Sequence, residues 1–207
     1  MIIGITGSSG AGKSTVSEVL KEKYNAKIIN ADEIAKKLSK KGTKYLKDIE
    51  RQFGGEILTE NGELNREKLA NLIYNSHEKR KLLNQCTFVH IKREIEKQIQ
   101  EGRKLKTNRE NSKEQETNKK LIIIDAPLLL EANLEAICDI TIAVISEDRE
   151  LQITRIVQRD NINKEQAIIR LNAQEMNEFY IEKCDYVIKN NDEIEDIKYQ
   201  LKKILNF

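Results

Sequence analysis

A glycine-rich loop near the start of the chain limits the possible folds more than any other segment. Residues 7–14 read Gly-Ser-Ser-Gly-Ala-Gly-Lys-Ser, which fits the pattern G-x-x-x-x-G-K-[ST] at every fixed position. The apolar run Met1–Thr6 before the loop predicts a buried strand. The apolar spacing after it predicts a helix from about Gly12 to Lys23. This order of elements predicts a phosphate-binding loop, or P-loop, in an α/β protein.

The residue types of the loop suit a nucleoside triphosphate. Backbone N–H groups can wrap around a phosphate only in conformations that are open mainly to glycine, and the following helix adds its own free N–H donors. Lys13 can neutralise charge on the β- and γ-phosphates, and the Ser14 hydroxyl can ligate Mg²⁺. We therefore predict ATP and Mg²⁺ as ligands. The predicted nucleotide-binding residues are Gly10, Ala11, Gly12, Lys13, Ser14 and Thr15.

Strand and helix patterns alternate along the rest of the chain. We predict further strands at Lys27–Asn30, Leu121–Ile124, Asp139–Ile145 and Asp185–Ile188. Residues 33–102 are predicted to be mostly helical, with one long helix from about His77. Further helices are predicted at Glu147–Asp160, Lys164–Gln174 and Glu193–Leu205. The last is predicted to have one apolar face, formed by Ile194, Ile197, Leu201, Ile204 and Leu205. Such alternation is typical of a parallel sheet that is covered on both faces.

Asp125 supplies a second group for the phosphate site. A carboxylate at the end of a buried strand is costly unless it has a partner, and beside a P-loop such an aspartate typically holds Mg²⁺, directly or through water. The alternative is a cap of the turn before Pro127. A GTPase is disfavoured, because the late segment Ile188–Asp192 does not match the guanine-binding pattern N-K-x-D.

Composition sets broad bounds on the function. The chain has 207 residues, 39% hydrophobic and 34% charged, with a net charge of +2, which suits one soluble domain and predicts no nucleic-acid partner. Cys86, Cys138 and Cys184 are an odd number at wide spacing, which disfavours a disulfide framework or zinc site. We see no secretory signal and no run long enough to cross a bilayer. We therefore expect no membrane association and a cytoplasmic location.

Several segments together resemble the dephospho-coenzyme A kinase family. The resemblance covers nearly the whole chain except residues 103–120, and its most specific segments are Asp125–Glu131 (D-A-P-L-L-L-E) and Gly62–Arg66 (G-E-L-N-R). Further similar segments are Asn30–Ala35, Gly54–Leu58, Gln152–Arg155 with Arg159-Asp160, Arg170 with Gln174, and Cys184–Asn190.

The chain also departs from the family pattern. Thr87 is followed by Phe-Val where the family commonly has His-Pro, and His90 lies two places later. The first acidic position of the family's D-A-D segment is Asn30, and the loop has Ser8-Ser9 where Gly-Ile is common. Residues 103–120 are predicted to be a solvated polar insertion or a frayed extension of the preceding helix. We expect His90 to be structural or on the surface. The apolar face of residues 77–102 is expected to belong to the core and not to a binding surface; it consists of Leu82, Cys86, Val89, Ile95 and Ile99.

The resemblance implies phosphorylation of the ribose 3′-hydroxyl of dephospho-coenzyme A by ATP, giving coenzyme A and ADP. Asp32 would accept or orient the hydroxyl proton; alternatively, it caps the next helix. Arg155 would stabilise transition-state charge. Arg159 and Leu128, with Asp32, would bind substrate. Arg66 would contact the acceptor or cap a helical turn.

For the arginines Arg155, Arg159 and Arg170 the alternative is surface ion pairing with Glu147, Asp148, Glu150 or Glu165.

From the sequence as a whole we predict a three-layer P-loop kinase fold with a parallel five-stranded sheet, as a single domain. Its core is about 1–32, 121–146 and 183–207, with a helical acceptor-binding region at about 33–102 and a lid at about 147–182. Alternative functions are another metabolite kinase, of the nucleoside or nucleotide type, and an ATP-binding adaptor with poor turnover.

Overall fold

The structure is a computed structural model of the 207-residue chain, and it describes residues 1–107, 121–190 and 193–205. The chain divides into two compact units. One unit comprises Met1–Ile29 with Gly102–Phe207, and the other comprises Asn30–Glu101. They are called the sheet unit and the helical unit below. The predicted insertion falls partly on helix α5, which extends to Thr107, while residues 108–120 lie outside the described residues.

The sheet unit is built on five strands in the order β2-β3-β1-β4-β5. The strands are β1 (Ile2–Thr6), β2 (Lys27–Asn30), β3 (Ile122–Asp125), β4 (Ile140–Ile145) and β5 (Tyr186–Lys189). The strand β1 pairs in parallel with both β3 and β4, and β4 pairs in parallel with β5. The predicted strands are thus confirmed, and each observed strand end lies within one residue of the predicted one.

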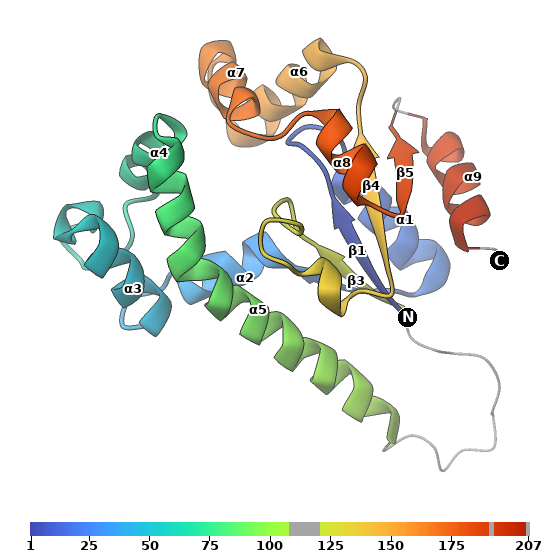
Figure 1. Cartoon of the computed structure of the whole chain (residues 1–207), viewed down its shortest axis with the longest axis horizontal. Coiled ribbons are helices and arrows are strands. Elements are labelled where there is room, and N and C mark those ends of the chain that lie inside the picture. Colours follow the sequence, from blue (N-terminus) through green and yellow to red (C-terminus); the bar gives the residue numbers. More distant parts are fainter. Residues whose placement is uncertain (108–120, 191–192, 206–207) are drawn as a thin grey trace. The chain divides into compact units, whose positions relative to one another are not determined.

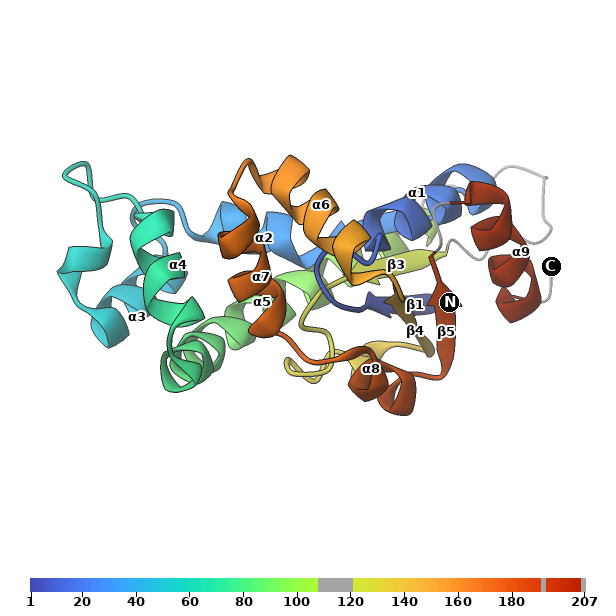
Figure 2. The ribbon, with the colours of Figure 1, turned by 90° about the horizontal axis from the view of Figure 1, so that it is seen from above.

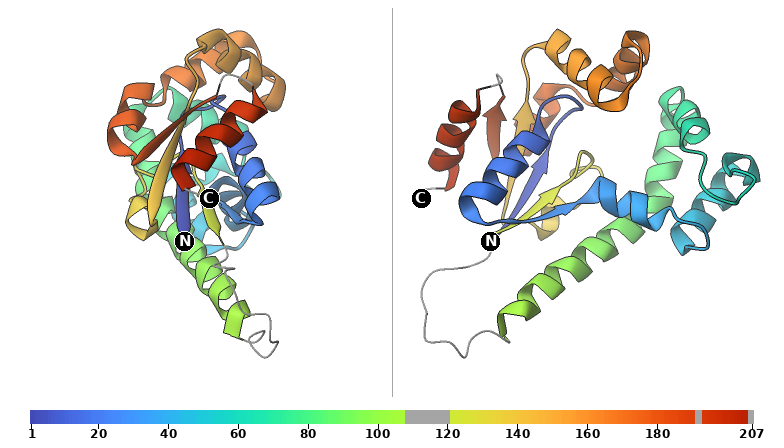
Figure 3. Two further views of the ribbon diagram at one scale, coloured as in Figure 1. Left: turned by 90° about the vertical axis from the view of Figure 1, so that its right-hand side faces the viewer. Right: turned by 180° about the vertical axis from the view of Figure 1, so that it is seen from behind.

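One face of the sheet is covered by α1 (Lys13–Tyr24) and α9 (Ile194–Leu205) (Figure 2). Alternate residues of the strands, such as Ile5 and Val144, share a buried cluster with Leu20 and Leu201 of these two helices. Figure 3 shows α1 and α9 side by side. The apolar face predicted for α9 is buried at Ile197, Leu201 and Leu205, whereas Ile194, at the start of the helix, is 52% exposed.

The opposite face is covered by α8 (Asn177–Lys183), which packs on β4, and by the segment that follows β3. Tyr180 of α8 and Leu129 of that segment are almost fully buried. The sequence pattern does not predict α8. This helix has only seven residues, and the residue at its N-cap position, Met176, makes no side-chain capping hydrogen bond, so the usual start signal is missing.

The segment predicted as a lid, about 147–182, ends in α8, which packs on β4; the rest of it contains α6 (Arg149–Asp160) and α7 (Lys164–Asn172). They pack on each other through Ile153, Ile156, Ala167 and Leu171, and they lie beyond the end of β1 from which the P-loop leaves (Figure 1). Each starts with a capping side chain: Asp148 accepts from the N–H of Leu151, and Asn163 forms a capping box with Gln166.

The helical unit contains α2 (Ala31–Leu38), α3 (Lys44–Phe53), the 3₁₀ turn η1 (Gly55–Ile57), α4 (Arg66–Tyr74) and most of α5 (His77–Thr107). The turn η2 (Glu135–Ile137) belongs to the sheet unit. The small core of the helical unit is formed by Tyr45, Ile49, Ile57 and Leu69, and it also includes Cys86. The predicted apolar face of α5 is only partly buried: Ile95 and Ile99 are buried, but Leu82 and Val89 are 42% and 55% exposed, so the prediction was wrong for those two residues.

Candidate active site

The P-loop connects β1 to α1, as the pattern predicts. Gly10 and Gly12 have φ angles of +75° and +91°, in the left-handed region that strongly favours glycine. Space is equally restrictive. A Cβ atom on Gly10 would lie 2.5 Å from the carbonyl oxygen of Gln152, and one on Gly12 would lie 1.8 Å from Nδ2 of Asn190. The loop is therefore enclosed by α6 on one side and by the end of β5 on the other.

Lys13 opens α1 and folds back over the loop. Its side chain is buried, and its ammonium group donates hydrogen bonds to the carbonyl oxygens of Gly7 and Ser8, at 2.7 and 2.9 Å. The positive charge is thus held against the loop that would carry the phosphates. Ser14 follows on the exposed side of the helix, and Thr15 is half-buried.

Asp125 lies at the end of β3 and is only 5% exposed. Its carboxylate accepts a hydrogen bond of 3.2 Å from Ser17 Oγ of α1. Ser14 precedes Ser17 by three residues, so the two serines are neighbours along α1, the first exposed and the second buried. A buried carboxylate beside a serine-bearing helix face supplies the hard oxygen donors that Mg²⁺ prefers, so the residues present fit this ion. The neighbouring turn is fixed by Thr6, whose hydroxyl donates to the carbonyl oxygen of Pro127 at 3.1 Å.

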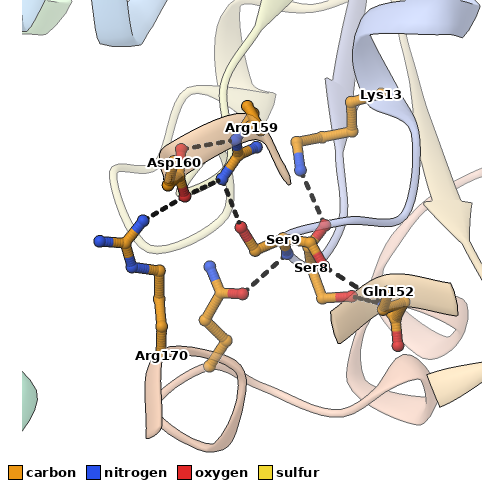
Figure 4. Close-up of polar contacts among 8 residues, drawn as sticks. Ser8, Ser9, Lys13, Gln152, Arg159, Asp160 and Arg170 are labelled. Carbon is orange, nitrogen blue, oxygen red and sulfur yellow. Dashed lines mark hydrogen bonds and ion pairs between the residues drawn. The ribbon is translucent and has the colours of Figure 1, made fainter. Parts of the chain in front are cut away.

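Three lid arginines are brought to the P-loop or to one another. Arg155 donates from Nη1 to the carbonyl oxygen of Gly10 at 2.9 Å. Arg159 donates from Nη2 to Ser9 Oγ at 3.0 Å (Figure 4). Arg159 and Arg170 both form ion pairs with Asp160. Hydrogen bonding by Arg159, together with the charges of both arginines, holds the pKa of Asp160 below its usual range.

Surface ion pairing with four nearby acids was the alternative explanation for these arginines, and two of those acids pair with lysines. Glu150 pairs with Lys164 and Glu147 pairs with Lys189, each at the surface. Two of the arginines instead contact P-loop atoms, which is what a phosphate-directed role requires.

The structure adds three amide side chains that sequence reasoning did not assign to the site. Gln152, buried in α6, donates to Ser8 Oγ at 2.8 Å. Gln174, after α7, accepts from the backbone N–H of Ser9 at 2.7 Å. Asn190, buried after β5, donates to the carbonyl oxygen of Ala11 at 2.9 Å. All three fall inside segments that resemble the family, which is the only signal that could have singled them out.

In the helical unit, the predicted base Asp32 is exposed in the first turn of α2. The cap of this helix is Asn30, whose side chain accepts from the backbone N–H of Glu33 at 2.9 Å. The alternative that Asp32 is the N-cap is therefore wrong. It also follows that the asparagine that replaces the family's first acidic residue retains a capping oxygen.

Arg66 is the first residue of α4, and its guanidinium donates to Ser39 Oγ. Ser39 is buried and also donates to the carbonyl oxygen of Lys36 at 3.0 Å. Arg66 thus links the start of α4 to the end of α2. Its predicted contact with the acceptor stays a prediction, as does that of Leu128, which is 37% exposed in the turn after β3.

His90 has a structural environment, as expected. Its Nε2 lies 2.7 Å from Asp48 Oδ2, and its ring meets the Tyr45 ring edge-on at 5.9 Å between centroids. Hydrogen bonding by His90 lowers the pKa of Asp48, and burial raises that of Tyr45 to about 12. The pair joins α3 to α5 within the helical unit.

The parallel sheet, the P-loop with its lysine, the carboxylate at the end of β3 and the arginine-bearing helices define a P-loop kinase. Comparisons with known proteins agree with this class. The family description "Dephospho-CoA kinase" matches residues 1–196. The chain therefore belongs to the dephospho-CoA kinase family.

Individual relatives show the same assignment. A dephospho-CoA kinase of Fusobacterium nucleatum is 40% identical over 207 residues, covering 100% of this chain and 96% of the relative. One of Listeria innocua is 35% identical over 199 residues, covering 96% and 92%. Among solved structures, a dephospho-CoA kinase from Campylobacter jejuni has a TM-score of 0.59 at 27% identity, covering 99% and 95%. The crystal structure of TT1252 from Thermus thermophilus has a TM-score of 0.75 at 25% identity, covering 100% and 96%.

More distant structures support the fold alone. A shikimate kinase from Acinetobacter baumannii has a TM-score of 0.53 at 18% identity, covering 99% of this chain and 93% of that one. Among the described residues, no helix is both long and apolar enough to cross a membrane.

Proposed function

We propose that Lys13, Asp32 and Arg155 carry the reaction of the family, the transfer of the γ-phosphoryl group of ATP to the ribose 3′-hydroxyl of dephospho-coenzyme A. The observation that supports this most strongly is the set of positive groups on the P-loop. Lys13 and Arg155 both contact loop carbonyl oxygens, and Arg159 contacts the Ser9 hydroxyl. Phosphoryl transfer depends mainly on positioning and on stabilising charge, and these groups supply both.

ATP would bind through the backbone N–H groups of Gly10–Thr15, with the start of α1 directed at the phosphates. Lys13 would neutralise the β- and γ-phosphate charge, and Arg155 would stabilise the charge that develops during transfer. Ser14 and Asp125 would hold Mg²⁺, directly or through water. When bound, the ion would supply charge neutralisation between the phosphates.

Asp32 would orient the acceptor hydroxyl and take its proton. Asn30 caps α2, and Asp32 is exposed in the first turn of that helix, where a substrate can reach its carboxylate. Arg66, Leu128 and Arg159 would bind the acceptor and its phosphates. The three free cysteines suit a reducing compartment, so we propose the cytoplasm.

Asp32→Asn tests the role of the base. We expect turnover to fall about 10²- to 10⁴-fold, the usual contribution of a positioned general base, while the dissociation constant for ATP changes little. Glu33→Gln is the matched control, because Glu33 is the adjacent exposed acid in the same helical turn. Equal losses in the two variants, or normal turnover by Asp32→Asn, would return Asp32 to a surface role.

Lys13→Ala tests the phosphate site. Removal of a preorganised charge in such a site costs on the order of 10²-fold or more in turnover. Retained turnover in this variant would contradict the assignment of the P-loop.

A further inference from the structure

Asp160, which the proposed mechanism does not use, joins two lid arginines. It is the last residue of α6, and its carboxylate accepts from three guanidinium N–H groups. Arg159 donates from Nε to Oδ1 and from Nη2 to Oδ2, each at 2.9 Å. Arg170 of α7 donates from Nη1 to Oδ2. One carboxylate thus fixes two cations that come from different helices.

The position of Asp160 argues against a purely local stabilising role. A carboxylate at the C-terminal end of a helix meets the negative end of the helix dipole, which is unfavourable. The cost is offset here by the two arginines, and the side chains of Asp160 and Arg170 are only 21% and 24% exposed. The ion pair therefore lies in a less screened setting than an ordinary surface pair.

The cluster continues directly into the P-loop. Nη2 of Arg159, which binds Asp160, also donates to Ser9 Oγ at 3.0 Å. The backbone N–H of Ser9 donates to Gln174 Oε1, two residues beyond α7. Figure 4 shows this run of contacts from Arg170 through Asp160 and Arg159 to Ser9. Ser9 is one of the two serines that depart from the family's common Gly-Ile, so this chain has a hydroxyl group with which to bind the arginine.

We propose that Asp160 is a positioning residue for phosphoryl transfer, which holds the guanidinium groups of Arg159 and Arg170 side by side at the P-loop so that they act together on the phosphates. A long arginine side chain loses considerable rotamer freedom when it is fixed. Because the Asp160 carboxylate already binds the guanidinium group, this loss of conformational entropy occurs before substrate binds and does not weaken binding. The inference rests on the proposed role of Arg159 toward phosphate.

Asp160→Asn tests the proposal, because asparagine keeps the size of the side chain and removes its charge. We expect kcat to fall about 10- to 100-fold, less than the 10³-fold or more associated with a complete arginine finger, while KM for ATP changes by no more than about threefold. Glu150→Gln is the matched control on the same helix, since its partner is Lys164 and its side chain is 72% exposed. The control should keep wild-type kcat.

A multiple-mutant comparison gives the readout that a merely structural role would not move. If Asp160 acts through Arg159 and Arg170, adding Asp160→Asn to the variant Arg159→Ala/Arg170→Ala should slow turnover no further. Multiplicative losses would overturn the proposal, and so would a wild-type kcat in Asp160→Asn or an equal loss in Glu150→Gln.

Asp160→Glu is a second variant whose kcat can be measured if Asp160→Asn unfolds below the assay temperature. It retains the charge but displaces the carboxylate by one methylene group, so we expect kcat to be reduced at least about threefold, between wild type and Asp160→Asn. A wild-type kcat in Asp160→Glu would contradict the claim that the position of the carboxylate matters. Failure of the proposed function is distinct: the wild-type enzyme itself would then release no ADP in response to dephospho-coenzyme A.

Discussion

Gly12→Ala should destabilise the sheet unit because two separate restraints meet at this residue. Its φ of +91° lies in the left-handed region, where an alanine costs about 1–2 kcal/mol. The new Cβ would also lie 1.8 Å from Asn190 Nδ2, so the amide must leave the carbonyl oxygen of Ala11. Loss of a hydrogen bond between buried groups costs about 1–3 kcal/mol.

The expected loss in the free energy of unfolding is therefore about 2–5 kcal/mol. For a chain of this length it corresponds to a fall in melting temperature on the order of 10 °C. Denaturant unfolding and calorimetry would measure both. Gly42→Ala is the control for the conformational part, because Gly42 has a φ of +84° with nothing within 4 Å of an added Cβ. It should lose only about 1–2 kcal/mol.

A double-mutant cycle separates the steric part. In the Gly12→Ala background, Asn190→Ala removes the side chain that the new Cβ meets, so it should cost at least about 1 kcal/mol less than in the wild type. Equal losses in Gly12→Ala and Gly42→Ala, with no coupling to Asn190, would refute the reasoning.

Three further predictions concern other parts of the chain. Burial raises the pKa of the Cys138 thiol to about 12 and that of Cys184 to about 11, and it also raises the pKa of Cys86. The folded protein should therefore react with iodoacetamide at pH 8 far more slowly than the unfolded chain, and equal rates would contradict this. Hydrogen bonds from Thr141 lower the pKa of Asp185, so its stabilising effect is present above about pH 3.9 and lost as the pH falls from there through the folded-state pKa. Asp185→Asn should flatten that part of an acid-unfolding curve, and an unchanged slope would show that the pair is unimportant. Leu201→Ala should lower the free energy of unfolding by about 2–5 kcal/mol, because this side chain is fully buried. Ile194→Ala should change it by no more than about 0.5 kcal/mol, because this side chain is 52% exposed. Similar losses in the two variants would contradict the assigned core face of α9.

Much of the sheet unit is predictable because its signals are local. The apolar run before Gly7 and the glycine loop specify β1, the P-loop and α1, and the run before Asp125 specifies β3. The helix α9 follows from apolar periodicity. Its first residue, Ile194, departs from that pattern, since it is 52% exposed, whereas Ile197, three residues later, is buried.

The helical unit is harder to predict because its core is small. Leu82 and Val89 fit the apolar period of α5, yet the cluster around Tyr45 and Ile57 does not reach them. The periodicity of one helix does not show how far the packing against its neighbours extends. An asparagine is a common helix cap, but choosing between Asn30 and Asp32 requires the residue at which α2 begins, which is Ala31 and not residue 33 as predicted.

The site is predictable in its charged groups but not in its connections. Lys13, Asp125 and the three arginines can be named from motifs, whereas the partners of those arginines depend on how α6 and α7 pack on each other. Gln152, Gln174 and Asn190 are uncharged amides that bond to loop atoms 144 to 179 residues away in the sequence. Such long-range contacts leave no local pattern in the sequence.

The release of ADP by the purified protein with ATP and Mg²⁺, with and without dephospho-coenzyme A, tests the central claim most directly. Adenosine and uridine serve as control acceptors. We expect release that depends on dephospho-coenzyme A and is abolished by Lys13→Ala. Release with a nucleoside alone, or none with any acceptor, would contradict the assigned reaction.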